Sequence, residues 1–533
     1  MKQAAKKFLS TQVNTSFKFF LFLEANTKND MKTFIAIFII SLSFASLQAQ
    51  TSSLKVTTHV SDEVKENFKS KGRIFLFVNS GAREPRFSTW PNKSNLIYAT
   101  NLDWNADDPF TFDPSVDLVK SRDISLNNIP DGKYYVQVLW DQDFKESRIN
   151  APGNLYSEAL EVELKGSKNI ELPLTGIIEE RKMAEHELLK EINFKSKILS
   201  DWWGKDVYLK AAVLLPNNYF DNTDTKYPVR YNIAGYGGRY TRAERLAGDA
   251  DFMNWWLSDE AVQVVNVFLD GEGPFGDCYQ LDSENSGPYG KALTEEFIPY
   301  LEKEFRGIGT PETRFVDGCS TGGWVSLALQ LIYPDFFGGC FSYSPDPVDF
   351  EYCQLINIYK DENAYINEYD YLRPIVRDIY GEPIISQKDF IFYENVLGYS
   401  DTYITSGGQF SAFTALYSPK GEDGLPKPMF DPLTGKIDHE VAEHWRKYDL
   451  KDYVETNWET LGPKIRGKIW VWGADMDNFY LNPALRSFER MLQNQDNPKS
   501  DAVITFSPMT GHCQEYSYKK ALLQIGEKLN SSE

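Results

Sequence analysis

Residues 314–324 read RFVDGCSTGGW. A short apolar run leads into the pattern Gly-x-Ser-x-Gly, and a helical pattern follows over 322–332. This order of strand, tight turn and helix is typical of a nucleophile elbow, in which glycines prevent clashes and the serine hydroxyl projects above a sheet. The alternative is a glycine-rich helix start in which the serine is only an N-cap. We interpret Ser320 as a nucleophile.

Strand-like runs alternate with helical patterns on both sides of this turn. The apolar runs lie at 207–215, 227–234, 262–270, 314–317, 339–343, 469–472 and 502–506. The clearest helical patterns lie at 291–305 and 322–332. Such alternation predicts an α/β domain with a mostly parallel sheet, which we place at residues 201–533. Residues 346–465 interrupt the alternation and are expected to form an insertion or lid.

The residues before this domain have a different pattern. Runs with period-two alternation lie at 54–60, 72–79, 133–140, 159–164 and 169–174. They predict a small all-β sandwich of immunoglobulin-like type over residues 51–176, which either supports its neighbour or binds glycan. Residues 177–200 are charged, with apolar positions at helical spacing, and predict a linker helix.

The composition limits the partners. The 533 residues include 56 Lys plus Arg and 76 Asp plus Glu, so the formal charge is −20 at pH 7. An acidic surface repels phosphate backbones and anionic lipid headgroups. Nucleic-acid binding is therefore not expected.

The most apolar run lies near the N-terminus, at residues 34–47. Met31-Lys32 precedes it and Gln48-Ala49-Gln50 follows it, which is typical of a signal peptide over about 31–49. We interpret residues 1–50 as two parts: a spurious N-terminal extension ahead of a translation start at Met31, and then this signal peptide. The run is too short to span a bilayer, and no cysteine for a lipid anchor follows it. The protein is expected to be secreted or periplasmic.

A nucleophilic serine needs a base, and in an elbow fold the chain order is Ser, acid, His. The histidines that follow Ser320 are His439, His444 and His512. His512 comes directly after the last strand-like run and is the candidate base. His439 and His444 are five residues apart, so on a helix they point about 140° away from each other and are poorly placed to share a metal. We expect both to be surface or packing residues.

The acid is expected after the run at 469–472. Asp475 and Asp477 both lie there, in the sequence GADMDNFY. Either carboxylate could accept a hydrogen bond from the imidazole and hold its tautomer. A calcium site made by both is a third interpretation.

Two cysteines flank the candidate nucleophile and base. Cys319 precedes Ser320, and Cys513 follows His512. If Ser320 and His512 are in contact, the neighbouring backbones are close enough for a disulfide, which an exported protein keeps oxidised. We therefore predict a Cys319–Cys513 disulfide. An odd number of cysteines then remains, so at least one is unpaired: Cys278, Cys340 and Cys353.

An oxyanion hole requires backbone N–H groups. One is expected from Thr321, directly after the nucleophile, and another from the loop in YNIAGYGGR, at Tyr236 or Gly237. Arg239 and Arg242 follow this loop and either meet an anionic substrate or are solvated.

The segment from Val207 to His512 resembles the esterase group of the α/β-hydrolases, which includes S-formylglutathione hydrolases, feruloyl esterases and siderophore esterases. The resemblance rests on AAVLLP, YNIAGYGG, SGPYGKALTEEFIPYLEKEFR, GCSTGG, GADMDNFYL and GHC. It implies an α/β-hydrolase domain, and its D-x-F step favours Asp477 over Asp475 as the acid. The pairs Cys319-Ser320 and His512-Cys513 also resemble the CS-D-HC motif of tannases and fungal-type feruloyl esterases.

Together these features predict a secreted serine carboxylic-ester hydrolase that works through an acyl-enzyme and needs no cofactor or metal. The resemblance and the added sandwich suggest a small-molecule or polysaccharide-linked ester as substrate, with feruloyl or acetyl groups. Two alternatives are a serine peptidase of the same fold and an inert glycan-binding protein.

Overall fold

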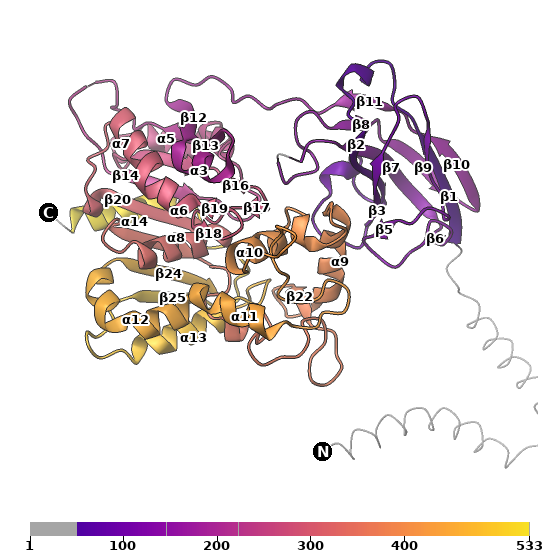
Figure 1. The fold of residues 1–533 in the computed structure, drawn as a ribbon. Coiled ribbons are helices and arrows are strands. Elements are labelled where there is room, and N and C mark those ends of the chain that lie inside the picture. Colours follow the sequence, from indigo (N-terminus) through magenta and orange to yellow (C-terminus); the bar gives the residue numbers. More distant parts are fainter. Residues whose placement is uncertain (1–50, 145, 222, 532–533) are drawn as a thin grey trace, which may run out of the picture.

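The computed structural model describes residues 51–531 except 145 and 222. The expected signal peptide at 31–49 lies outside the described residues. Figure 1 shows an all-β part on one side of the molecule, an α/β part on the other, and the orange insertion packed between them. The α/β-hydrolase-like arrangement and the sheet-rich N-terminal part agree with the expected fold class, while the immunoglobulin-like type remains a prediction.

The N-terminal part contains two β-sheets. One sheet consists of β1 (Thr51–Thr58), β4 (Phe110–Phe112), β6 (Ile129–Pro130) and β10 (Ser167–Glu171). The other consists of β2 (Lys71–Asn79), β3 (Asn95–Asp103), β5 (Val119–Lys120), β7 (Gly132–Asp141), β8 (Leu155–Ser157), β9 (Leu160–Leu164) and β11 (Leu174–Ile177). Leu54, Ile74, Leu76 and Trp140 belong to one buried cluster contributed by both sheets.

Strand β2 is buried on both faces, which explains its nearly continuous apolar sequence GRIFLFV. Ile74 and Leu76 face the core of the sandwich. Phe75 and Phe77 lie in a second cluster with Tyr393 and Val396 of the insertion. The sandwich and the insertion therefore share a packed interface.

The linker helix expected over 177–200 is wrong. Residues 178–188 contain no helix, and β12 (Leu189–Ser196) pairs antiparallel with β13 (Val207–Leu214). A seven-residue helix, α3 (Lys197–Trp203), follows. In β12, Ile192 and Ser196 are buried while Asn193 and Lys195 are exposed, so the segment presents the one-sided burial of an edge strand.

The central sheet of the α/β part has eight strands in the order β12-β13-β15-β14-β20-β21-β24-β25. From β15 onward the pairs are parallel, as the alternation predicted. The remaining strands are β14 (Val229–Ile233), β15 (Val265–Leu269), β20 (Arg314–Cys319), β21 (Gly339–Tyr343), β24 (Ile469–Ala474) and β25 (Val503–Ser507).

Helices and short hairpins surround this sheet. The helices are α4 (Arg242–Ala247), α5 (Ala250–Trp256), α6 (Tyr289–Ala292), α7 (Ile298–Glu304), α8 (Thr321–Ile332), α12 (Leu450–Ile465), α13 (Asn482–Gln493) and α14 (Tyr518–Asn530). A π-helical turn, Leu293–Phe297, joins α6 to α7. The hairpin strands are β16 (Glu272–Gly273), β17 (Gly276–Asp277), β18 (Asp282–Ser283) and β19 (Gly287–Pro288).

The insertion is shorter than the expected 346–465. It holds β22 (Pro374–Arg377), β23 (Pro383–Ser386), α9 (Gln387–Leu397), α10 (Gln409–Tyr417) and α11 (His439–Trp445). Helix α12 instead contacts α8 and α13 and leads into β24, so it continues the α/β alternation (Figure 1). The apolar residues of α12 are widely spaced among charged ones, so its sequence was not identified as a helix of the α/β domain.

Candidate active site

Ser320 lies on the turn between β20 and α8, with φ 62° and ψ −127°. This left-handed backbone is costly for a residue with a side chain and is held by the close packing around it. A Cβ atom on Gly318 or on Gly322 would overlap the carbonyl oxygen of Ile233. Both glycines of the elbow are therefore required, and they place Ser320 at the carboxyl end of the central strands.

His512 and Asp477 form a close pair. Nδ1 of His512 lies 2.7 Å from Oδ2 of Asp477, and the Asp477 side chain is only 1% exposed. Burial lowers the pKa of His512, but the charge and hydrogen bond of Asp477, together with the charge of Asp346, raise the pKa overall. The backbone N–H of Phe479 donates to Oδ1 of Asp477 at 2.8 Å, and the Phe479 ring packs edge-on against the imidazole at 4.8 Å. The imidazole is thus fixed in position.

The alternative acid, Asp475, has a different partner. It forms an ion pair with Arg486. Asp475 and Asp477 each face a different partner, an arrangement that does not favour the suggested calcium site shared by both carboxylates. The structure brings Asp477, and not Asp475, to His512.

Ser320 and His512 line the same pocket, but Ser320 Oγ is hydrogen-bonded elsewhere. It donates to Oδ1 of Asp346 at 3.5 Å. Nε2 of His512 is buried and has no hydrogen-bond partner within the described part of the chain. A serine rotamer change would be needed to direct the hydroxyl proton to Nε2.

Asp346 is a site residue that the sequence reasoning missed. It is 5% exposed and accepts hydrogen bonds from the hydroxyl groups of Tyr279 at 2.8 Å and Thr321 at 2.9 Å. Burial raises the pKa of its carboxyl group. It lies three residues after β21, the strand beside β20. An acid at the carboxyl end of the neighbouring parallel strand is the signal that could have identified it.

The predicted disulfide between Cys319 and Cys513 is present, with a Cα–Cα distance of 6.0 Å. It joins the residue before Ser320 to the residue after His512, across 194 positions of the sequence. Three cysteines are free and buried: Cys278, Cys340 and Cys353. The bridge therefore ties the two candidate catalytic segments together.

The expected oxyanion loop follows β14 and reaches the nucleophile. A Cβ atom on Gly235 would lie 3.6 Å from Cβ of Ser320. Tyr236 lines the pocket with Ser320, and its hydroxyl donates to the carbonyl of Gly407 at 2.7 Å. Gly237 lines a separate, smaller pocket. Thr321 is the first residue of α8, directly after Ser320.

The two arginines after this loop are engaged by protein groups. Arg239 pairs with Asp270 at 2.8 Å. Arg242 is buried and donates to the carbonyls of Asn232 and Leu269. Both guanidinium groups are thus bound by protein groups, and Arg242 also lines the pocket that holds Ser320.

The insertion histidines lie away from the pocket. His444 contacts the Tyr417 carbonyl at 2.8 Å and the Glu284 carboxylate at 3.0 Å. His439 is an exposed first residue of α11. In the described ranges, no three His, Cys, Asp or Glu side chains lie together as a group that could hold a metal ion. No described helix is long and apolar enough to cross a membrane.

The pocket above Ser320 has a volume of about 550 Å³ and aromatic walls. Its aromatic lining includes Phe390, Phe410 and Phe413 from the insertion and Phe479 from the loop after β24. Trp90 reaches it from the sandwich. The three parts of the fold thus enclose one apolar space beside a serine and a histidine.

Comparison with known proteins gives one family match. Residues 206–449 match the family Esterase, described as "Putative esterase". A search of curated proteins gives no match.

Several solved structures are similar at low identity. One titled ferulic acid esterase is 18% identical and covers 64% of this chain and 97% of its own, with a TM-score of 0.40. An S-formylglutathione hydrolase from Agrobacterium tumefaciens is 15% identical, with coverages of 64% and 93% and a TM-score of 0.35. A ferulic acid esterase from Anaeromyces mucronatus is 14% identical, with coverages of 66% and 91% and a TM-score of 0.31. The esterase-family match covers the elbow and the strands β13, β14, β15, β20 and β21, ends before the segments of Asp477 and His512, and supports an ester hydrolase of α/β-hydrolase-like fold.

Proposed function

We propose that the protein is an exported serine carboxylic-ester hydrolase. Ser320 is the nucleophile, His512 the general base and then acid, and Asp477 the residue that orients His512. The observation that carries the proposal is the 2.7 Å contact between His512 and Asp477 in the pocket that also holds Ser320. The disulfide supports an oxidising compartment, and with it the proposed export.

The first half-reaction forms an acyl-enzyme. Ser320 Oγ turns from Asp346 toward His512, gives its proton to Nε2 and attacks the ester carbonyl carbon. The carbonyl oxygen becomes an oxyanion, which accepts hydrogen bonds from the backbone N–H groups of Thr321 and Tyr236. The C–O bond to the alcohol then breaks, and the imidazolium of His512 gives its proton to the departing oxygen.

The second half-reaction regenerates the serine. A water molecule gives a proton to His512 Nε2 and attacks the acyl carbon, and the bond to Ser320 Oγ then breaks as His512 returns the proton to it. Throughout, the buried carboxylate of Asp477 stabilises the charged imidazolium. The two half-reactions use side chains and backbone N–H groups of this chain together with the ester and water.

The walls of the pocket favour an aromatic acyl group. Flat rings pack edge-on or offset against other rings, and besides three tyrosines the lining offers five apolar ones: Trp90, Phe390, Phe410, Phe413 and Phe479. A feruloyl ester of a polysaccharide fits this lining better than an acetyl ester, which would leave most of the space unfilled.

The proposal is tested by hydrolysis of p-nitrophenyl acetate and methyl ferulate. The wild type and a Ser80→Ala variant, which changes an exposed serine of the sandwich, should turn over ester at equal rates. Ser320→Ala should lose about a thousandfold or more in kcat with unchanged circular dichroism. Faster cleavage of peptide anilides than of esters would instead indicate a peptidase. Ester turnover that persists in Ser320→Ala would refute the assignment.

A further inference from the structure

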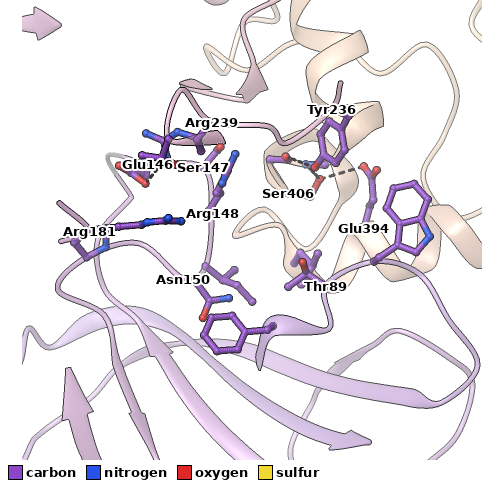
Figure 2. Close-up of a pocket in the computed structure, with 18 of the residues that line it drawn as sticks. Thr89, Glu146, Ser147, Arg148, Asn150, Arg181, Tyr236, Arg239, Glu394 and Ser406 are labelled. Atoms are coloured by element: carbon purple, nitrogen blue, oxygen red, sulfur yellow. Dashed lines mark hydrogen bonds and ion pairs between the residues drawn. The ribbon is translucent and has the colours of Figure 1, made fainter. Parts of the chain in front are cut away.

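A second cavity lies between the sandwich and the hydrolase domain. It has a volume of about 480 Å³, and we call it the interdomain cleft. Figure 2 shows its sides: Arg148 and Asn150 come from the sandwich, and Tyr236, Ser406 and Glu394 come from the hydrolase part. Of its lining, the catalytic steps above use only the backbone N–H of Tyr236.

The interdomain cleft adjoins the active-site pocket. Trp90, Tyr236 and Phe390 line both. The Trp90 ring packs edge-on against Phe390 at 5.4 Å and against Phe479 at 5.9 Å. Phe479 in turn contacts the imidazole of His512. Trp90 therefore stands between the two cavities, with one side toward the catalytic residues and the other toward the sandwich.

Direct bonds between the two domains fix the shape of the interdomain cleft. Nη2 of Arg148 donates to the carbonyl of Gly237, in the oxyanion loop, at 2.5 Å. The N–H and hydroxyl groups of Ser147 donate to Glu272 at 3.2 and 3.0 Å. These contacts hold the two sides of the interdomain cleft together, so little conformational entropy would be lost on binding.

The charges of the lining argue against an anionic ligand. Four basic and four acidic side chains line the interdomain cleft. Each of its arginines already has a carboxylate partner: Arg148 with Glu272, Arg181 with Glu244, and Arg239 with Asp270. A ligand anion would have to displace one of these partners or bind Lys210, the remaining basic side chain of the lining, beside four carboxylates.

The uncharged surface suits a ligand with both hydroxyl groups and flat apolar faces. Phe87 and Trp90 line the interdomain cleft and are 61% and 44% exposed. The guanidinium of Arg86 lies over the Phe87 ring at 4.0 Å and holds it in place. Exposed rings in a concave site beside amide and hydroxyl groups are a binding surface rather than core packing. Sugar rings present C–H faces to such rings and hydroxyls to such polar groups.

We propose that the interdomain cleft binds neutral sugar residues of the glycan that carries the hydrolysed ester group. This inference rests on the proposed ester hydrolysis and gives the sandwich a direct part in substrate choice. The acyl group occupies the pocket above Ser320, and the glycan runs past Trp90 toward Phe87.

Kinetics on two esters with the same acyl group test the proposal. We compare methyl ferulate with a ferulate ester of a neutral arabinoxylo-oligosaccharide. In Phe87→Ala, kcat/KM for the glycan ester should fall about tenfold more than kcat/KM for methyl ferulate. Phe87→Tyr keeps the ring and should keep the wild-type ratio. Phe220→Ala removes an equally exposed ring outside both cavities and should match the wild type. An unchanged ratio in Phe87→Ala would overturn the proposal.

Direct binding separates this proposal from the proposed function. In the Ser320→Ala variant, calorimetry should detect binding of the unesterified arabinoxylo-oligosaccharide. Adding Phe87→Ala should weaken this binding about tenfold. Oligosaccharides of uronic acids serve as the anionic comparison, and their preferential binding would overturn the inference. If no ester is hydrolysed but the neutral glycan binds through Phe87, the proposed function fails while the glycan site stands.

Discussion

Ser320 Oγ donates its hydrogen bond to Asp346, at 3.5 Å, while Nε2 of His512 has no hydrogen-bond partner among the residues that the structure describes. Asp346 is also the acceptor for the hydroxyl groups of Tyr279 and Thr321. A buried carboxylate beside a nucleophile and its base places negative charge close to the imidazole, and this charge is one of the causes that raise the pKa of His512. We infer that Asp346 holds the resting serine and tunes the base.

Asp346→Asn should shift the pH dependence of activity. Only neutral His512 accepts the serine proton, so kcat/KM is lost as pH falls through the raised pKa of His512. Removing the Asp346 charge lowers that pKa, and the acid limb of the profile should move to lower pH. Asp349→Asn changes another buried acid, one paired with Lys451, and should leave the limb in place. An identical acid limb in Asp346→Asn would show that Asp346 carries no charge while His512 titrates.

Asp477→Asn and Asp475→Asn should differ sharply. Loss of the Asp477 carboxylate removes the partner of Nδ1 and should lower kcat about a thousandfold or more. Asp475 is paired with Arg486 at a partly exposed position, so its amide variant should retain activity within about tenfold. The measurement is kcat for p-nitrophenyl acetate with folding checked by circular dichroism. Equal losses in both variants would contradict the assignment of the acid.

The parts of the site that the sequence predicted are those with a local signature. The elbow around Ser320 needs glycines at fixed offsets in the sequence. The cysteines beside Ser320 and His512 form a disulfide, so their positions indicate that these two distant segments are in contact. The parallel strands were identified because strands covered on both faces are continuous apolar runs.

The missed features depend on how distant segments pack. Asp346 follows a strand in a sequence that reads as a turn, and only the fold brings it to Ser320. Trp90 reaches the active site through the docking of two domains, which no local pattern encodes. Strand β12 was expected to be a helix because its charged residues fit both the helical and the strand period. Its pairing with β13 makes it a strand.

Removal of the disulfide should affect both stability and catalysis. The Cys319→Ala/Cys513→Ala variant loses the link that holds the Ser320 and His512 segments together, and the free energy of unfolding should fall by about 2–4 kcal/mol. Thermal unfolding with and without a reductant provides the control, since the buried Cys278, Cys340 and Cys353 are the same in both proteins. Reductant should lower the Tm of the wild type but not that of the variant. A Tm that is equal in the two proteins would contradict a stabilising role.

Arg73 joins the sandwich to the insertion. The fully buried Arg73 donates to the carbonyl of Val396 at 3.1 and 3.0 Å and pairs with Asp401 at 2.7 Å. Arg73→Met keeps much of the side-chain volume but leaves that carbonyl without its donor and Asp401 without its cation. We expect about 2 kcal/mol of destabilisation, measured by urea unfolding.

The same variant links this interface to the active site. Val396 lies on α9, which also carries Phe390, so a loosened α9 should disturb the contact of Phe390 with Trp90 and raise KM for methyl ferulate. Lys71→Met changes an exposed residue of the same strand and should alter neither stability nor KM. If Arg73→Met loses stability while KM stays at the wild-type value, the interface supports the fold without shaping the pocket, and the sandwich acts on substrate through Trp90 and Phe87 alone.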